Sequence, residues 1–177
     1  MGVTYVTAPV EILTPRFRLK ELRESDVTSR YLGWLADPAA QHFIAAAQQT
    51  HELSVLTEYV KQRVNCPDVF FLGIFDQLTG LHVGNVKYEP VDSVKGYAIM
   101  GILIGEMEFR GKGVATEVLM ASGQWLKHNR AISQIFLGVS VDNQNAIKAY
   151  RKAGFIEMDT PHIKNGTPNT ITMGWML

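Results

Sequence analysis

The segment from Ile102 to Glu117 constrains the fold more than any other part of the sequence. It begins with an apolar, β-branched run that is too short for a helix, so it predicts a buried strand. A loop with two glycines follows (Arg110-Gly-Lys-Gly113), and apolar residues then recur at helical spacing from Val114 onward. A strand, a glycine loop and a helix in this order aim backbone N–H groups and a helix dipole at an anion. We therefore expect an anion-binding junction here, beside which Arg110 and Lys112 add positive charge.

Two familiar phosphate-binding motifs do not fit this loop. A P-loop ends in a hydroxyl residue that holds magnesium, whereas Lys112 is followed by glycine and valine. The dinucleotide motif GxGxxG also fails, because Gly111-Lys-Gly113 is followed by Val114-Ala-Thr116. Glycines between a strand and a helix are also common as simple turn residues. The loop alone therefore leaves phosphate binding and a structural turn both open.

A second motif follows a short strand expected at residues 135–139. Asp142 or Asn143 can cap the next helix, and Gly154 suits the left-handed position beyond its end. Together, Arg110-x-x-Gly-x-Ala115 and Asn143-x-x-Ala-x-x-x-Tyr-x-Lys-x-Gly-Phe155 resemble the GNAT superfamily of acetyl-CoA-dependent N-acetyltransferases. The first matches the pyrophosphate loop of that family, with alanine in the last place, and the second matches its helix-and-turn signature. The order of the expected elements extends the resemblance over most of the chain.

The resemblance implies how acetyl-CoA, the acetyl donor, is held. Loop amides would face its pyrophosphate, the backbone of the preceding strand would pair with its pantetheine arm, and Asn143 would bond that arm or only cap the helix. A glycine at the end of the strand suits a bulge that splays it from the next strand. The same backbone groups can polarise the thioester carbonyl. No metal is expected, and the expected cofactor-binding residues are Leu103, Ile104, Gly105, Arg110, Gly111, Lys112, Gly113, Val114, Ala115 and Asn143.

Transfer to an amine also needs a base and an acid. A primary amine of pKa ~10.4 is about 99.9% protonated at pH 7, so a base must take its proton, usually through a water. Tyr150 occupies the general-acid position of the family, with a packing tyrosine as the alternative. Glu106 lies where the strand meets the loop and is the first candidate base, with a solvated carboxylate beside Arg110 as the alternative. The further candidates, in order, are Glu108, His82 and Asp92.

The whole chain, residues 1–177, predicts one domain. Residues 1–15 are expected to be a lead-in and 89–95 a loop. Helices are expected after Ser25 or Asp26, at 53–64, from Val114 and after Asn143. Strands are expected at 16–22, 69–75, 81–88, 97–105, 135–139, 155–158 and 169–176. The resulting fold class is α+β (mixed α/β), with a mostly antiparallel, splayed sheet of about six to seven strands flanked by about four helices.

The resemblance places the early helical region on the acceptor side of the cleft. Aromatic and histidine residues there would line an acceptor pocket or only pack the helices together: Tyr31, Trp34, His42 and Phe43. In the strand at 81–88, alternation puts Asn85 and Lys87 on one face and His82 on the other. Asn85 and Lys87 would contact the acceptor or face solvent.

Composition limits the partners and the compartment. Lys+Arg and Asp+Glu both number 17, which argues against nucleic acid and an acidic membrane surface, and mildly against a polyamine acceptor. The single cysteine, Cys66, cannot form an internal disulfide. No signal-peptide pattern opens the chain and no apolar run approaches ~20 residues, so we expect a cytoplasmic enzyme. The oligomeric state stays open, a homodimer included.

The expected function is therefore that of an N-acetyltransferase moving an acetyl group from acetyl-CoA to a primary amine of a small molecule. The segment His82–Lys87 resembles family members that act on amino sugars or nucleotide-linked amino sugars. The alternatives are a protein N-terminal acetyltransferase of the ribosomal-protein type, a polyamine acetyltransferase, and a non-catalytic acyl-CoA-binding module. Retention of Tyr150 argues against the last of these.

Overall fold

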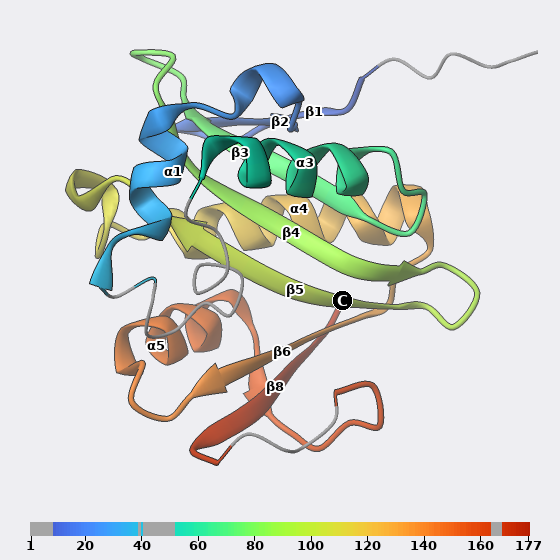
Figure 1. Cartoon of the computed structure of the whole chain (residues 1–177). Coiled ribbons are helices and arrows are strands. Elements are labelled where there is room, and N and C mark those ends of the chain that lie inside the picture. The colour runs from blue at the N-terminus through green and yellow to red at the C-terminus, as the bar shows by residue number, and fades with distance from the viewer. Residues whose placement is uncertain (1–8, 39, 41–51, 164–167) are drawn as a thin grey trace, which may run out of the picture.

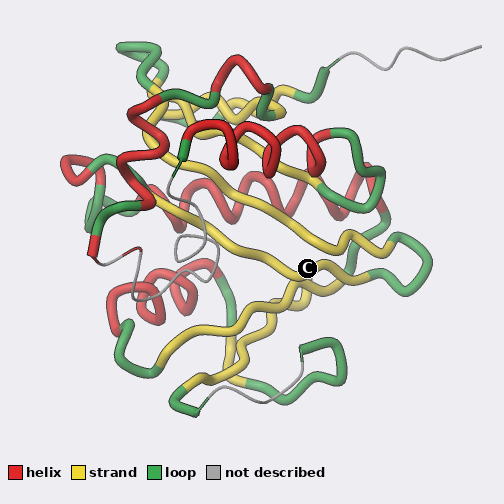
Figure 2. Tube along the Cα trace, in the orientation of Figure 1, coloured by secondary structure: helices red, strands yellow, loops and turns green. Residues whose placement is uncertain are grey.

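The computed structural model describes residues 9–38, 40, 52–163 and 168–177. His42 and Phe43 lie outside these ranges. One sheet crosses the molecule in the order β1-β2-β3-β4-β5-β6-β8-β7, and only the β5–β6 pair is parallel among these strands (Figures 1 and 2). Its strands are β1 (Glu11–Leu13), β2 (Phe17–Glu21), β3 (Phe70–Asp76), β4 (His82–Asp92), β5 (Tyr97–Ile104), β6 (Gln134–Ser140), β7 (Ile156–Glu157) and β8 (Thr170–Met176).

The sheet has eight strands, more than the sequence predicts, because a short segment before Pro15 also pairs. β1 lies in the expected lead-in and pairs antiparallel with β2, with Ile12 opposite Leu19. Such a short strand is defined by its partner, so it leaves little local pattern. β4 also continues to Asp92, where a loop was expected, because a register shift after Tyr88 lets the strand resume its pairing with β5.

The helices cover the two faces of this sheet. α3 (Leu53–Val64) lies in front of β3 and β4 in Figure 1, together with α1 (Ser29–Leu35), while α4 (Val114–Arg130) lies behind the sheet. α5 (Gln144–Ala153) packs beside α4. The cap of α1 is Thr28, whose side chain accepts a hydrogen bond from the amide of Tyr31; Ser25 and Asp26, the expected caps, lie in a preceding 3₁₀ turn, η1 (Glu24–Asp26).

Two apolar cores hold these layers together. The larger lies between the sheet and α4 and α5, and it buries Val114, Val118 and Leu126 completely or nearly so. Tyr88 reaches into it from β4, and its hydroxyl pairs with that of Ser122 at 2.7 Å, so these two buried hydroxyls satisfy each other. The smaller core lies beneath α1 and α3. None of the described helices has the length and apolar character to cross a membrane.

The sheet opens between β5 and β6. These strands pair only over Tyr97–Ile99 and Gln134–Phe136, while β5 remains paired with β4 and β6 with β8. At the far end of β5 the carbonyl of Val83 accepts hydrogen bonds from two successive amides, those of Gly105 (2.9 Å) and Glu106 (3.2 Å). Two residues opposite one is the pattern of a bulge, and it turns the chain out of the sheet. The expected splay is therefore present, and it leaves a wedge between the two strands (Figure 1).

Candidate active site

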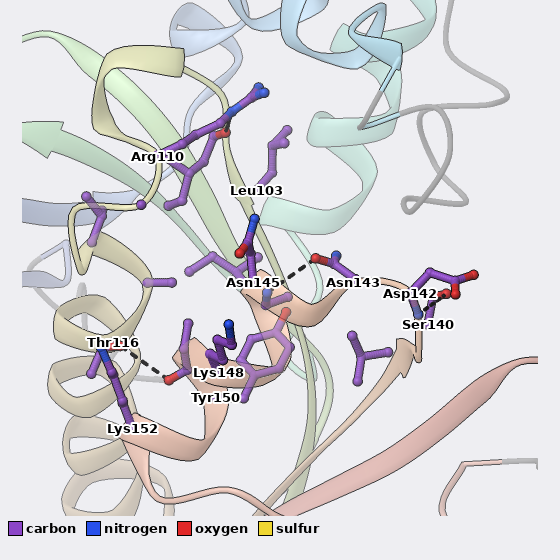
Figure 3. A pocket seen from close by; sticks show the side chains of 18 of the residues that line it. Leu103, Arg110, Thr116, Ser140, Asp142, Asn143, Asn145, Lys148, Tyr150 and Lys152 are labelled. Atoms are coloured by element: carbon purple, nitrogen blue, oxygen red, sulfur yellow. Dashed lines mark hydrogen bonds between the residues drawn. The ribbon is translucent and has the colours of Figure 1, made fainter.

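A cavity of about 1090 Å³ lies between the splayed ends of β5 and β6. Leu103 and Arg110 stand on one side of it, and Lys148 and Tyr150 of α5 on the other (Figure 3). The hydroxyl of Thr116 on α4 donates to a carbonyl of α5 at 3.2 Å, which ties the two helices together beside the cavity. The sequence-predicted residues that line it are Leu103, Ile104, Arg110, Gly111, Gly113, Val114, Ala115, Asn143 and Tyr150. The others, Gly105, Glu106 and Lys112, stand outside its lining.

The loop before α4 takes a shape that requires its glycines. Gly111 and Gly113 have φ of 73° and 76°, in the left-handed region that other residues rarely adopt, and Gly113 is the N-cap of α4. The first-turn amides of a helix have no acceptor within it, and the positive end of its dipole lies there. These amides border the cavity at Val114 and Ala115, so the loop can hold an anion. Lys112 between the glycines is exposed.

Arg110 has a different environment from the one the sequence suggests. Its guanidinium donates to the carbonyls of Ile104 and Gly105, both at 2.9 Å, and to Oδ2 of Asp37 at 3.1 Å. These bonds hold the end of β5 against the loop and against the residues after α1. The charge that we expected beside a phosphate is therefore directed at oxygens of the chain itself.

Tyr150 lies deep in the cavity wall with its side chain 9% exposed. Its hydroxyl has no hydrogen-bond partner among the residues that the structure describes. Burial raises the pKa of this phenol to about 12, so it remains protonated at neutral pH. The capping residue of its helix is Asn143, which accepts from the amide of Ala146 at 3.2 Å, and Gly154 follows the helix end with φ of 108°.

The candidate bases lie in different places. Glu106 accepts hydrogen bonds from Nε1 of Trp34 (2.8 Å) and Nη1 of Arg30 (3.0 Å). Burial raises the pKa of its carboxyl, but these two bonds outweigh that effect and hold the pKa below its ordinary value. Glu108 is exposed in the short turn η3 (Met107–Phe109). Asp92 pairs at the opposite end of the β4–β5 ladder, far along the strands from the cavity.

His82 lies on the same side of β4 as Asn85, contrary to the expected alternation. A register shift lets His82 pair with Phe75 and Gly84 with Ile74, so one residue of β4 bulges and the faces change over. Nε2 of His82 is 2.8 Å from Oδ1 of Asn85, and burial lowers the pKa of the imidazole. Both residues therefore belong to the interior beneath α1.

Lys87 also faces the helices rather than open solvent. Its ammonium donates to the hydroxyl of Tyr59 on α3 at 2.8 Å and forms an ion pair with Glu89, which Arg63 joins at 3.1 Å. Its side chain is 24% exposed. Asn85 and Lys87 thus both bind side chains of the same chain. The sequence offered two alternatives for them, contact with the acceptor or exposure to solvent, and neither alternative includes these contacts.

The structure adds cavity residues that sequence reasoning missed. Ser140 and Asn145 line the cavity, as do two exposed lysines of α5, Lys148 and Lys152. Residues four positions apart share one face of a helix, so these two ammonium groups face the same opening. Lys152 is a position of the second motif and Lys148 lies between two others, so their four-residue spacing was the signal that the sequence offered.

The family model of the acetyltransferase (GNAT) domain matches residues 16–156. The chain belongs to the GNAT acetyltransferase family. Both the expected superfamily and the expected fold class are thereby confirmed. Among curated relatives, this GNAT chain is 32% identical over 74 residues to YobR of Bacillus subtilis strain 168, an uncharacterised N-acetyltransferase. The match covers 42% of the chain and 30% of YobR, so the chain spans less than a third of that relative's length.

Solved structures share the same GNAT fold over nearly the whole chain. RimL, a ribosomal L7/L12 alpha-N-protein acetyltransferase in complex with coenzyme A, superposes with a TM-score of 0.81 at 17% identity, covering 95% of this chain and 98% of RimL. The aminoglycoside acetyltransferase AAC(6')-Ib, in complex with coenzyme A and kanamycin, gives a TM-score of 0.72 at 20% identity, covering 90% and 94%. At such identities the likeness establishes the fold alone.

Proposed function

We propose that this chain is an acetyl-CoA-dependent N-acetyltransferase that acetylates a primary amine of a small molecule. The observation that carries the proposal is the cavity between β5 and β6, which brings an open strand edge, the N-terminus of α4 and the phenol of Tyr150 to one place. RimL and AAC(6')-Ib, both of this fold, are each described in complex with coenzyme A. Acetyl-CoA supplies the acetyl group as a thioester.

The chain's own groups suit the parts of that molecule. The left-handed glycines leave the first-turn amides of α4 open to the diphosphate, and Lys148 and Lys152 add positive charge from the opposite wall. From Ile102 to Ile104, β5 has no pairing with β6 on that side. Apart from the Ile104 carbonyl, which Arg110 binds, its main chain is therefore open to pair with the amide-bearing pantetheine arm. Asn143 would meet this arm at the start of α5.

Tyr150 would act as the general acid. The nitrogen of the neutral amine forms a bond to the thioester carbonyl carbon, and the carbon–sulfur bond then breaks. Tyr150 donates its phenolic proton to the departing sulfur, and the proton lost by the amine returns to solvent. A phenol with pKa of about 12 remains protonated until that step. Because a thiol of pKa ~8.5 is the stronger acid, the transfer is completed by a solvent proton that restores the phenol of Tyr150.

An amino sugar or a nucleotide-linked amino sugar is the acceptor that we favour. The likeness of the segment His82–Lys87 to members acting on such sugars supports it, as does the kanamycin in the AAC(6')-Ib complex. The second candidate is a protein N-terminus, which the description of RimL supports. Zero net charge argues against a polyamine, whose several positive charges favour an acidic protein.

Calorimetric titration with CoA, followed by thiol release from acetyl-CoA, tests the proposal. The acceptor panel holds amino sugars, nucleotide-linked amino sugars, short peptides with free N-termini, and spermidine. We expect micromolar CoA binding and turnover with an amino sugar. Turnover with the peptides alone would select the second candidate. CoA binding without turnover of any amine would leave an acyl-CoA-binding module, and absence of CoA binding would overturn the proposal.

A further inference from the structure

Trp34 of α1 packs against the end of the proposed cofactor strand, at Gly105, and both residues stand just outside the lining of the cavity. Its side chain is 5% exposed, and its indole packs directly on the backbone of Gly105. A Cβ atom at position 105 would overlap the ring, so only glycine allows this contact. Tyr31 and His82 pack against the ring, at centroid distances of 5.4 and 4.9 Å. The indole therefore has a fixed position where β5 turns out of the sheet.

Glu106 holds this indole in place. A single carboxylate oxygen accepts from the indole N–H of Trp34 at 2.8 Å and from Arg30 at 3.0 Å. Arg30 and Trp34 are four residues apart, so both project from one face of α1. The side chain of Glu106 is 21% exposed, which shields these charge-assisted bonds from much of the solvent.

A second clamp lies on the other side of Gly105. Arg110 binds the carbonyls of Ile104 and Gly105, and its third bond reaches Asp37 just beyond the end of α1. The end of β5 is thus fastened to α1 twice, by Glu106 through Trp34 and by Arg110 through Asp37. Any movement of α1 would be transmitted to the backbone at Gly105.

These contacts do not suit Glu106 as the general base. Its Oε1 is already an acceptor for two donors, and the charged groups that face it are Arg30 from α1 and Arg110 from the loop. Burial raises the pKa of this carboxyl, yet the bonds from Trp34 and Arg30 hold it below the ordinary value, so it has little tendency to take a proton from an amine.

We infer that Glu106 is a positioning residue, which acts through Trp34 to fix the backbone of Gly105 at the end of β5, next to the strand residues that line the cavity. This inference rests on the proposed function, because it takes the thioester to lie beside the end of β5. Its role is geometric: the acceptor nitrogen must approach the carbonyl carbon to about 3–3.5 Å, and a strand end displaced by an ångström costs a large part of that alignment. The functional group that Glu106 contributes is a hydrogen-bond acceptor, and its negative charge is secondary.

The comparison of Glu106→Gln with Glu106→Ala tests this role. A glutamine oxygen can still accept from the indole N–H, whereas alanine removes the anchor. We expect Glu106→Ala to lower kcat about tenfold with the best amine of the panel, and Glu106→Gln to restore most of that loss, with the pH profile of kcat/KM unchanged. Equal inactivation of both variants, with loss of the acid limb of that profile, would identify a general base and overturn the inference.

A readout independent of activity uses the ¹⁵N–¹H signal of the Trp34 indole, identified by its absence in Trp34→Phe. We expect this signal to move strongly in Glu106→Ala, to stay near its place in Glu106→Gln, and to titrate in the wild type below pH 4.5. An indole signal that keeps its wild-type position in Glu106→Ala would overturn the inference. The control Glu157→Ala removes an exposed carboxylate paired with Arg151, away from the cavity lining.

CoA titration of the same proteins separates the two claims. Wild-type protein that binds no CoA would overturn the proposed function, and this inference with it. Wild-type protein that binds CoA and turns over, but whose Gln and Ala variants at position 106 are equally inactive, would overturn the inference alone. We expect CoA affinity to change less than threefold in Glu106→Gln.

Discussion

Two regions that meet at the end of β5 are built by different means. The proposed cofactor side, formed by the end of β5, residues 109–116 and α5, depends on main-chain conformation: two left-handed glycines, an N-cap and an unpaired strand edge. The proposed acceptor side, formed by α1, α3 and the face of β4 beneath them, lies outside the lining of the cavity and depends on side chains that meet across the fold. Trp34 and Glu106 are 72 positions apart. A site built from main-chain conformation leaves a local pattern in the sequence. A site built from side chains of distant segments leaves no such pattern.

Tyr150→Phe gives the largest effect that we expect, because it removes the group that we propose as the proton donor. Turnover should fall about 100-fold, in the range of general acid catalysis, while CoA affinity stays within twofold. Steady-state kinetics and calorimetry measure the two quantities. Tyr97→Phe is the matched control, since Tyr97 stacks on His162 outside the cavity lining. An equal loss of turnover and CoA affinity would mean that Tyr150 is a packing residue.

Gly105→Ala tests the junction between the two sides. The added methyl would displace the indole of Trp34, and overpacking of this kind costs about 1–3 kcal/mol. We expect kcat with the amine to drop about tenfold. Gly101→Ala on the same strand is the control, because a Cβ atom there meets nothing within 4 Å. If both alanines behave alike in steady-state assays, the contact between Trp34 and Gly105 has no part in the transfer.

Gly113→Ala addresses the cofactor side through its backbone. A φ of 76° strains an alanine by about 1–2 kcal/mol, so the melting temperature should fall by several degrees, and CoA should bind more weakly. Gly33→Ala is the control, for which we expect a change of opposite sign. Gly33 lies inside α1 with open space around it, so alanine there should raise the free energy of unfolding by up to about 1 kcal/mol. Calorimetry that finds both variants equally stable would contradict the left-handed conformation.

The smallest effect concerns acid pH. Burial raises the pKa of Glu117 on α4, but hydrogen bonds from Thr14 and Arg16 outweigh it, so the pKa lies below the ordinary 4.5. A lowered folded-state pKa stabilises the fold above pH 4.5, and that contribution is lost as pH falls through the lower value. The urea concentration at half unfolding should therefore change less between pH 7 and pH 3.5 in Glu117→Gln than in the wild type. An equal change in the two proteins would mean that these bonds do not persist in solution.

The same contrast explains how far the sequence could be interpreted. The start of α4 and both ends of α5 were predictable because the signals are local: glycines at 111, 113 and 154, and a cap at Asp142 or Asn143, of which the structure shows Asn143. The cap of α1 at Thr28 was missed because Ser25 and Asp26 are equally good caps by type, and only the packing of Tyr31 and Trp34 selects the start.

Other features could not be predicted from the sequence, because they depend on contacts between segments that are far apart in the chain. β1 forms a strand because it pairs with β2. The second half of β4 forms a strand because a register shift lets it pair with β5 again, although Pro90 in the sequence argues against a strand there. The face of His82 was wrong because one bulged residue reverses the alternation. The bonds of Glu106 and Arg110 could not be expected either, since both residues have partners on or just beyond α1, and no periodicity connects those segments.

The engagement of Arg110 with three oxygens of its own chain has a consequence for the kinetics of ligand capture. A loop that is held by internal bonds has its final shape before a ligand arrives, so little conformational entropy is lost at the encounter. Association with the donor should then proceed as the docking of two prepared surfaces, with a rate set mainly by diffusion and by the charge of Lys148 and Lys152 at the entrance.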